Sequence, residues 1–129
     1  MQSARRLPLI LLLALLGLPL TGCVAVVAGA AGAGTVAWIQ GRLDSVIDAR
    51  FETVKGAAGA AISDLRLSKI SEKQDGLTAV FVARTADDTR VEIKVAKIAE
   101  KATKVEIRVG LMGDKALSTA ILDKIKANL

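Results

Sequence analysis

The chain has 129 residues, of which 18 are Lys or Arg and 13 are Asp or Glu, with one cysteine and no histidine. This length allows one small domain. The absence of histidine excludes His-based triads and histidine metal ligands, and a single cysteine excludes an intramolecular disulfide and a multi-cysteine metal site. We therefore expect no metal and no cofactor.

The N-terminus has the pattern of a bacterial lipoprotein signal. Arg5-Arg6 is followed by the uncharged run Leu7–Leu20, which is too short to cross about 30 Å of hydrocarbon as a helix. Leu20-Thr21-Gly22-Cys23 then resembles a lipobox, in which the cysteine is lipidated and becomes the first residue after cleavage. We predict a signal peptide over residues 1–22 and lipidation of Cys23.

A second interpretation of the N-terminus stays open, because no charged residue occurs from Leu7 to Gln40. A signal anchor or one long membrane helix would also have this composition. Gly29, Gly32 and Gly34 are unfavourable in an isolated lipid-facing helix, so we favour the lipoprotein signal. Cleavage would lower the net charge from +5 to +3, which gives no reason to expect a nucleic-acid partner.

Residues 23–37 form the next segment, which contains the lipidated cysteine and a Gly/Ala-rich run of small, uncharged residues. It fits a plain tether that lies near the lipid headgroups. It also fits a close-packing helix that mediates self-association, because small residues recur four positions apart, as at Ala28 and Gly32. We favour the tether, with self-association as the alternative.

The composition becomes that of a globular domain after this tether, and we place the domain at residues 38–129. Ala37–Leu43 is expected to form a short strand that carries Trp38. A helix should follow, from Ser45 or Asp48 to Leu65, because apolar residues recur there at steps of three and four.

Strands and turns are expected next in the chain. The predicted strands are Leu67–Glu72, Leu77–Arg84, Arg90–Lys97 and Thr103–Val109. The last two alternate apolar and charged residues, which is typical of a sheet with one covered face and one open face. A register that places Glu92 opposite Arg108 and Lys94 opposite Glu106 brings opposite charges together, and each such pair stabilises a sheet by about 0.2–1 kcal/mol. We therefore predict this register for the last two strands.

The chain ends in a second predicted helix, which begins after the N-cap residue Asp114 and carries an apolar stripe. The order β-α-β-β-β-β-α predicts a two-layer α+β domain, with both helices on one face of an antiparallel sheet. The residues that should be buried between the layers are Phe51, Val54, Ile62, Val91, Ile93, Val105, Ile107, Leu117, Ile121 and Ile125.

Several short motifs together resemble a family of short bacterial lipoproteins of unknown function, found largely in proteobacteria. They are the lipobox, the Gly/Ala run before Ile39-Gln40-Gly41-Arg42-Leu43, and the segments 108–114 and 121–125. The resemblance covers nearly the whole chain. It implies a compact α+β domain behind a lipid anchor and brings no catalytic residue, substrate or cofactor. Asp87-Asp88 departs from the Asp-Gly that we would expect in that turn.

Acid and base groups are present, but their positions favour structural roles. The candidate pairs of carboxylates are Asp87/Asp88, Glu72/Asp75 and Asp44/Asp48. All fall in expected turns or at helix starts, where Asp stabilises the local backbone by hydrogen bonding. The serines have no neighbouring base. We expect no enzymatic activity and assign no catalytic residue.

A candidate binding surface lies on the predicted hairpins, at Phe81, Arg90, Lys94, Lys104 and Arg108. It fits either a solvated face of mixed charge or a surface that touches anionic lipid, lipopolysaccharide or peptidoglycan. Whether the side chain of Phe81 is exposed or buried depends on the turn that follows its strand. A two-residue turn at Asp87-Asp88 would expose it, whereas a five-residue loop would bury it opposite Ile93, and we favour the two-residue turn.

We therefore predict a lipid-anchored, non-enzymatic envelope protein that contacts another envelope component, with self-association through the Gly/Ala run as the alternative. The expected partners are the membrane, through the N-terminal lipid, and envelope proteins or peptidoglycan. Val24, in place of Asp, follows the lipidated cysteine. In Gram-negative lipoproteins this favours the outer membrane, so we expect its periplasmic face as the location.

Overall fold

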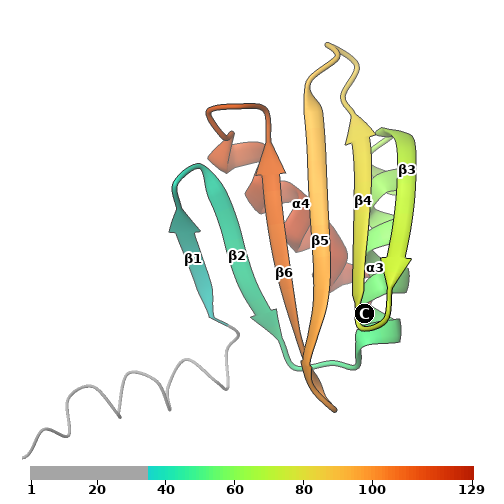
Figure 1. The fold of residues 1–129 in the computed structure, drawn as a ribbon. Helices are drawn as coiled ribbons and strands as arrows, with labels where there is room; N and C mark the ends of the chain where they lie inside the picture. Colours follow the sequence, from blue (N-terminus) through green and yellow to red (C-terminus); the bar gives the residue numbers. More distant parts are fainter. Residues whose placement is uncertain (1–34) are drawn as a thin grey trace, which may run out of the picture. The chain divides into compact units, whose positions relative to one another are not determined.

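A computed structural model describes residues 35–129, which form an antiparallel sheet and two helices (Figure 1). The predicted signal peptide, the lipobox and most of the tether lie outside the described residues. Within residues 35–129, no helix is long and apolar enough to span a bilayer. The elements are β1 (Val36–Ile39), β2 (Arg42–Ile47), α3 (Phe51–Asp64), β3 (Ser68–Asp75), β4 (Thr78–Arg84), β5 (Arg90–Ala99), β6 (Ala102–Val109) and α4 (Lys115–Ala127).

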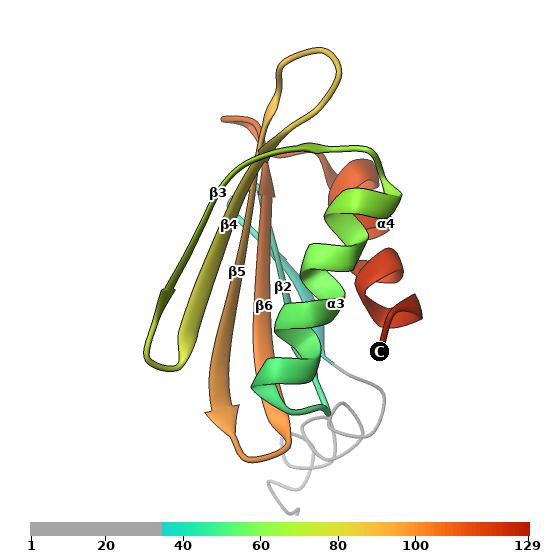
Figure 2. The same ribbon diagram turned by 90° about the vertical axis from the view of Figure 1, so that its right-hand side faces the viewer.

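The strands form one sheet in the order β1-β2-β6-β5-β4-β3, and every neighbouring pair is antiparallel. Both helices cover the same face of this sheet and leave the other face open (Figure 2). The predicted α+β class is therefore confirmed. The predicted register is confirmed as well, because Glu92 lies opposite Arg108 and Lys94 lies opposite Glu106.

The predicted single strand Ala37–Leu43 is wrong, because two strands, β1 and β2, occupy this region. Gln40 and Gly41 form a two-residue turn between them with φ values of 49° and 77°, the left-handed conformation that such hairpin turns require. Since β2 continues to Ile47, the helix begins later than expected, at Phe51. The sheet itself begins at Val36, two residues before the expected domain boundary.

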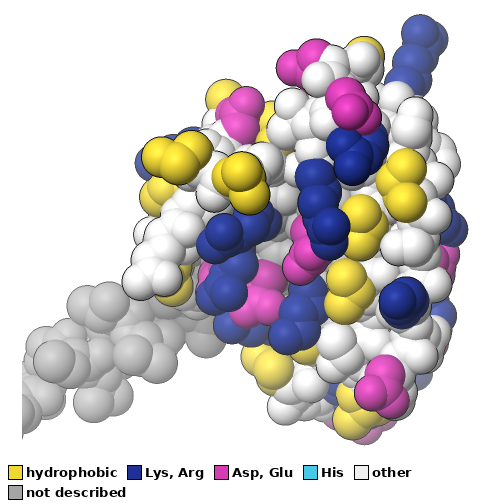
Figure 3. Space-filling view, turned by 45° about the horizontal axis from the view of Figure 1, so that its top comes forward, with side chains coloured by type: hydrophobic (Ala, Val, Ile, Leu, Met, Phe, Trp, Pro, Cys, Tyr) yellow, Lys and Arg dark blue, Asp and Glu magenta, His cyan; other side chains and the backbone are white. Residues whose placement is uncertain are grey.

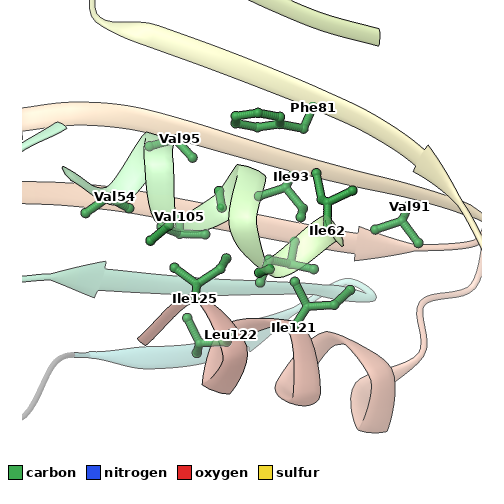
Figure 4. Close-up of a cluster of buried hydrophobic side chains, with 14 of the residues drawn as sticks. Val54, Ile62, Phe81, Val91, Ile93, Val95, Val105, Ile121, Leu122 and Ile125 are labelled. Atoms are coloured by element: carbon green, nitrogen blue, oxygen red, sulfur yellow. The ribbon is translucent and has the colours of Figure 1, made fainter. Parts of the chain in front are cut away.

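The core fills the space between the sheet and the two helices (Figure 4). All the residues predicted to be buried there are buried, except Leu117, which is partly buried. The side chain of Asp114 accepts a hydrogen bond from the backbone N–H of Leu117 at 3.0 Å, so the predicted N-cap of α4 is confirmed.

The expected exposure of Phe81 is wrong, because this ring is 2% exposed and lies in the core. The chain forms a five-residue loop over residues 85–89, which the backbone N–H of Thr85 closes by donating to the carbonyl of Thr89. Asp88 in this loop has a φ of 66°. The longer loop pairs Phe81 with Ile93, on the helix-covered face, and so removes Phe81 from the candidate surface.

Candidate functional site on the open face of the sheet

Charged side chains occupy the middle of the open face, on β2, β6 and β5 (Figure 3). Alternate residues of each strand point to this face, and the register places them in ranks across the three strands. The ranks are Arg42–Arg108–Glu92, Asp44–Glu106–Lys94 and Val46–Lys104–Ala96. Cationic and anionic residues thus alternate along each strand and face each other between β5 and β6, whereas β2 and β6 place Arg42 opposite Arg108 and Asp44 opposite Glu106.

The centre of this face is a salt-bridge cluster of Arg42, Asp44, Lys94, Lys104 and Glu106. The two carboxylates lie opposite each other and their side chains are only 10% and 14% exposed. Arg42 binds Asp44 through two nitrogens, at 2.6 and 3.0 Å. Lys104 Nζ lies 2.9 Å from Glu106 and 3.5 Å from Asp44, and Lys94 Nζ lies 3.6 Å from Glu106.

These contacts lower the pKa of both carboxyl groups. Burial raises the pKa of Asp44, but the hydrogen bond from Arg42 and the charges of Arg42 and Lys104 bring it below its ordinary value. Burial also raises the pKa of Glu106, and it is outweighed by the hydrogen bond from Lys104 and the charges of Arg42, Lys104 and Lys94. Both carboxylates are therefore ionised and paired at neutral pH, which makes the cluster a poor source or acceptor of protons.

The cluster should make the stability of the domain depend on acid pH. Because both pKa values are lower in the folded chain than in the unfolded chain, the stabilisation is complete above the unfolded values, about 4. It is lost as pH falls further, through the folded values. Urea unfolding between pH 7 and pH 2.5 should thus give a constant free energy down to about pH 5 and a decrease below about pH 4.

A double substitution checks this assignment. Asp44→Asn with Glu106→Gln should remove most of the decrease in stability between pH 5 and pH 2.5, because the two paired carboxylates are then absent. The control Asp123→Asn changes an exposed carboxyl of α4 and should keep the decrease. A double variant with the same pH dependence as the wild type would show that other groups cause it.

Arginine side chains from three strands border a second feature of the open face, a pocket of about 410 Å³ that we call the distal pocket. Residues of the β4–β5 loop and of the β6–α4 loop line it, and both loops lie at the end of the sheet away from the first residue of β1 (Figure 1). Its lining residues are Arg84, Asp88, Thr89, Arg90, Glu92, Arg108, Gly110 and Leu111.

Two large apolar side chains project from the loop beside this pocket. Leu111 and Met112 are 94% and 90% exposed. They stand between Gly110 and Gly113, whose φ values are 68° and 82°. An ideal Cβ at Gly113 would lie 2.3 Å from the carbonyl oxygen of Gly41. The loop therefore packs closely on the β1–β2 turn, which holds it at the end of the sheet.

The structure thus divides the predicted surface into two parts. Arg90 and Arg108 line the distal pocket, whereas Lys94 and Lys104 belong to the salt-bridge cluster. Leu111 at the pocket and Arg42 and Asp44 in the cluster were not predicted, and Arg84 was one of the hairpin cations but was not among the predicted binding residues. The sequence feature that could have indicated Leu111 is the apolar pair Leu111-Met112 between two glycines. Arg42 and Asp44 were missed because one strand was predicted over Ala37–Leu43, so that the second strand, β2, and its pairing with β6 were not foreseen.

Among residues 35–129, no group of three Asp, Glu, His or Cys side chains is placed to hold a metal ion. The chemistry that this face offers is that of exposed guanidinium groups and exposed apolar side chains. Such groups bind anions and apolar surfaces.

Comparison with known proteins identifies the family. Residues 6–128 match the family described as "Protein of unknown function (DUF3568)". No curated protein matches the chain. The match covers nearly the whole chain and confirms the predicted resemblance to an uncharacterised family. Lipid attachment stays a prediction.

Proposed function

We propose that this chain, which belongs to the DUF3568 family of proteins of unknown function, is a lipid-anchored, non-enzymatic protein of the bacterial cell envelope. The observation that carries the proposal is Leu20-Thr21-Gly22-Cys23, placed directly after a basic end and an uncharged, leucine-rich run. The lone cysteine of the chain stands at the position where a lipobox requires it. Lipid attachment there would hold the sheet domain at a membrane surface.

The role proposed for the domain is to contact another envelope component through the open face of its sheet. That face has a salt-bridge cluster whose carboxylates are held ionised, and a pocket bordered by three arginines. The ionised, paired carboxylates do not favour acid or base catalysis, whereas the arginines and the exposed Leu111 favour binding. The location proposed from Val24 is the periplasmic face of the outer membrane.

Cys23→Ala tests the anchor. In a Gram-negative host supplied with labelled fatty acid, the wild type should carry the label and lose residues 1–22. Cys23→Ala should carry no label and remain as the full-length precursor, because the thiol that receives the lipid is absent. Val24→Ala alters the next residue without touching the thiol and should be labelled normally. An unlabelled wild type, or cleavage elsewhere, would contradict the proposal.

The second candidate function is assembly through residues 23–37. It is favoured by the small residues four positions apart in this segment, such as Ala28 and Gly32, which permit close helix packing. Affinity capture from envelope extracts separates the two functions. Recovery of another envelope component supports the contact function, whereas recovery of this chain alone supports self-assembly.

A further inference from the structure

The register brings three guanidinium groups to the distal pocket. Arg84 of β4 lies directly opposite Arg90 of β5, and Arg108 of β6 lies opposite Glu92, the next residue of β5 on this face. Like charges placed directly opposite each other disfavour strand pairing. Asp88 and Glu92 offset two of the three positive charges, so the five charged groups that line the pocket leave one net positive charge.

The guanidinium groups keep donors for a ligand. Arg84 Nη1 lies 3.1 Å from the Asp88 carboxylate, Arg90 Nη2 lies 3.0 Å from that of Glu92, and Arg108 Nη2 donates to the Gln40 carbonyl at 3.1 Å. Within the described residues, these bonds use one terminal nitrogen of each group. The second terminal nitrogen of each has no hydrogen-bond partner among residues 35–129. Planar guanidinium groups match the oxygens of a phosphate.

A glycine lies in the wall of the pocket between the arginines and the apolar loop. An ideal Cβ at Gly110 would lie 3.4 Å from the methyl carbon of Thr89, another residue of the pocket wall. The φ of Gly110, 68°, favours glycine here. Leu111, the next residue, lines the same pocket and is 94% exposed.

From this combination we infer that the distal pocket binds the headgroup of an anionic phospholipid, with Leu111 and Met112 entering the apolar part of the lipid surface. The phosphate would accept from the guanidinium groups, and the exposed apolar side chains would leave water. The inference rests on the proposed envelope function, for which it names the partner. Nucleic acid fits less well, since no aromatic side chain lines the pocket to stack on a base.

The reach of the chain is compatible with this contact. Residues 24–35 could extend by about 40 Å, whereas β5, the longest strand, has 10 residues and a length of about 33 Å. A lipid at Cys23 would therefore allow the distal pocket to contact the membrane in which that lipid is inserted.

The test uses the full chain with Cys23→Ala, so that lipid binding is measured independently of lipid attachment. Dihexanoylphosphatidylglycerol, below its micelle concentration, is titrated in while NMR follows the amide of Gly110 and the methyl groups of Leu111. We expect saturable shifts at both residues. Dihexanoylphosphatidylcholine and inorganic phosphate, titrated separately, should bind about tenfold more weakly, because one lacks net charge and the other lacks an apolar part.

Variants assign the site. Arg90→Gln and Arg108→Gln should each weaken phosphatidylglycerol binding about tenfold, and Arg90→Lys should recover only part of the loss, since Lys cannot bind in a bidentate manner. Leu111→Ser should weaken binding about fivefold. Lys73→Gln, a cation of β3, and Leu77→Ser, an exposed leucine of the β3–β4 turn, are the matched controls and should bind as the parent chain does.

Three results would overturn the inference: no saturable shift, equal binding of phosphatidylcholine, or equal losses in the control variants. Inorganic phosphate that binds as tightly as phosphatidylglycerol, with no effect of Leu111→Ser, would also overturn it, since the pocket would then bind free phosphate rather than lipid. A wild type that is lipidated in cells but does not bind contradicts this inference alone. A chain that binds but is never lipidated contradicts the proposed anchor.

Discussion

Ile107→Ala should lower the free energy of unfolding by about 2–5 kcal/mol, the range found when a fully buried branched side chain is truncated. Ile107 is 0% exposed, and its strand β6 lies between β2 and β5. Its partners across the sheet are Leu43 and Ile93, which are buried as well. The lost side chain would therefore leave a cavity in the middle of the core, where the strands on both sides restrict its collapse.

Urea unfolding, followed by the fluorescence of the single tryptophan Trp38, measures this change. The matched control is Ile98→Ala, since Ile98 is 56% exposed and lies on the neighbouring strand. It should change the free energy of unfolding by no more than about 0.5 kcal/mol. A decrease below about 0.5 kcal/mol for Ile107→Ala would mean that the other face of the sheet is covered.

Gly113→Ala should lower the free energy of unfolding by about 2–4 kcal/mol, through backbone strain and overpacking together. The φ of Gly113 is 82°, a conformation that disfavours any Cβ. The added carbon would also lie 2.3 Å from the carbonyl oxygen of Gly41 and 2.6 Å from its Cα. Both are backbone atoms of a tight turn, so relief requires the β6–α4 loop to separate from the β1–β2 turn.

Gly56→Ala is the control for this substitution, measured by the same urea unfolding. Gly56 lies within α3, and nothing comes within 4 Å of an ideal Cβ at this position. Alanine should therefore increase the free energy of unfolding, by about 0.5–1 kcal/mol, through its higher helix propensity. If Gly113→Ala did not lower the free energy of unfolding, the close packing of the two turns would not contribute to stability.

For the candidate surface, the sequence identified the charged positions but not which of them line the distal pocket and which belong to the salt-bridge cluster. Arg90 and Arg108 line a pocket and Lys94 and Lys104 belong to a salt-bridge cluster, although all four alternate with apolar residues in the same way. The difference comes from Asp44 and Arg42, which β2 brings beside β6. The residues in contact there are more than 50 positions apart in the chain, and a local sequence pattern cannot predict such a contact.

The burial of Phe81 was likewise not determined by the pattern of its own strand. The alternation in its strand allowed either face to be covered, and the outcome depended on whether two or five residues close the next turn. Thr85 and Thr89 decide this by pairing their backbones across the five-residue loop. A change of register by one residue moves every side chain of a strand to the other face, so one turn determined the exposure of the largest residue in the sheet core.

The sequence by itself determined the class of the fold, the register of β5 against β6, the N-cap at Asp114 and nearly all of the core. Each of these depends on residues close in sequence or on an alternation that permits one arrangement. The tertiary structure alone decided that β2 pairs with β6, that Asp44 is buried among cations, and that Arg84, Arg90 and Arg108 surround one pocket. These features depend on contacts between distant segments, whose free energy is gained only when the sheet and both helices have assembled.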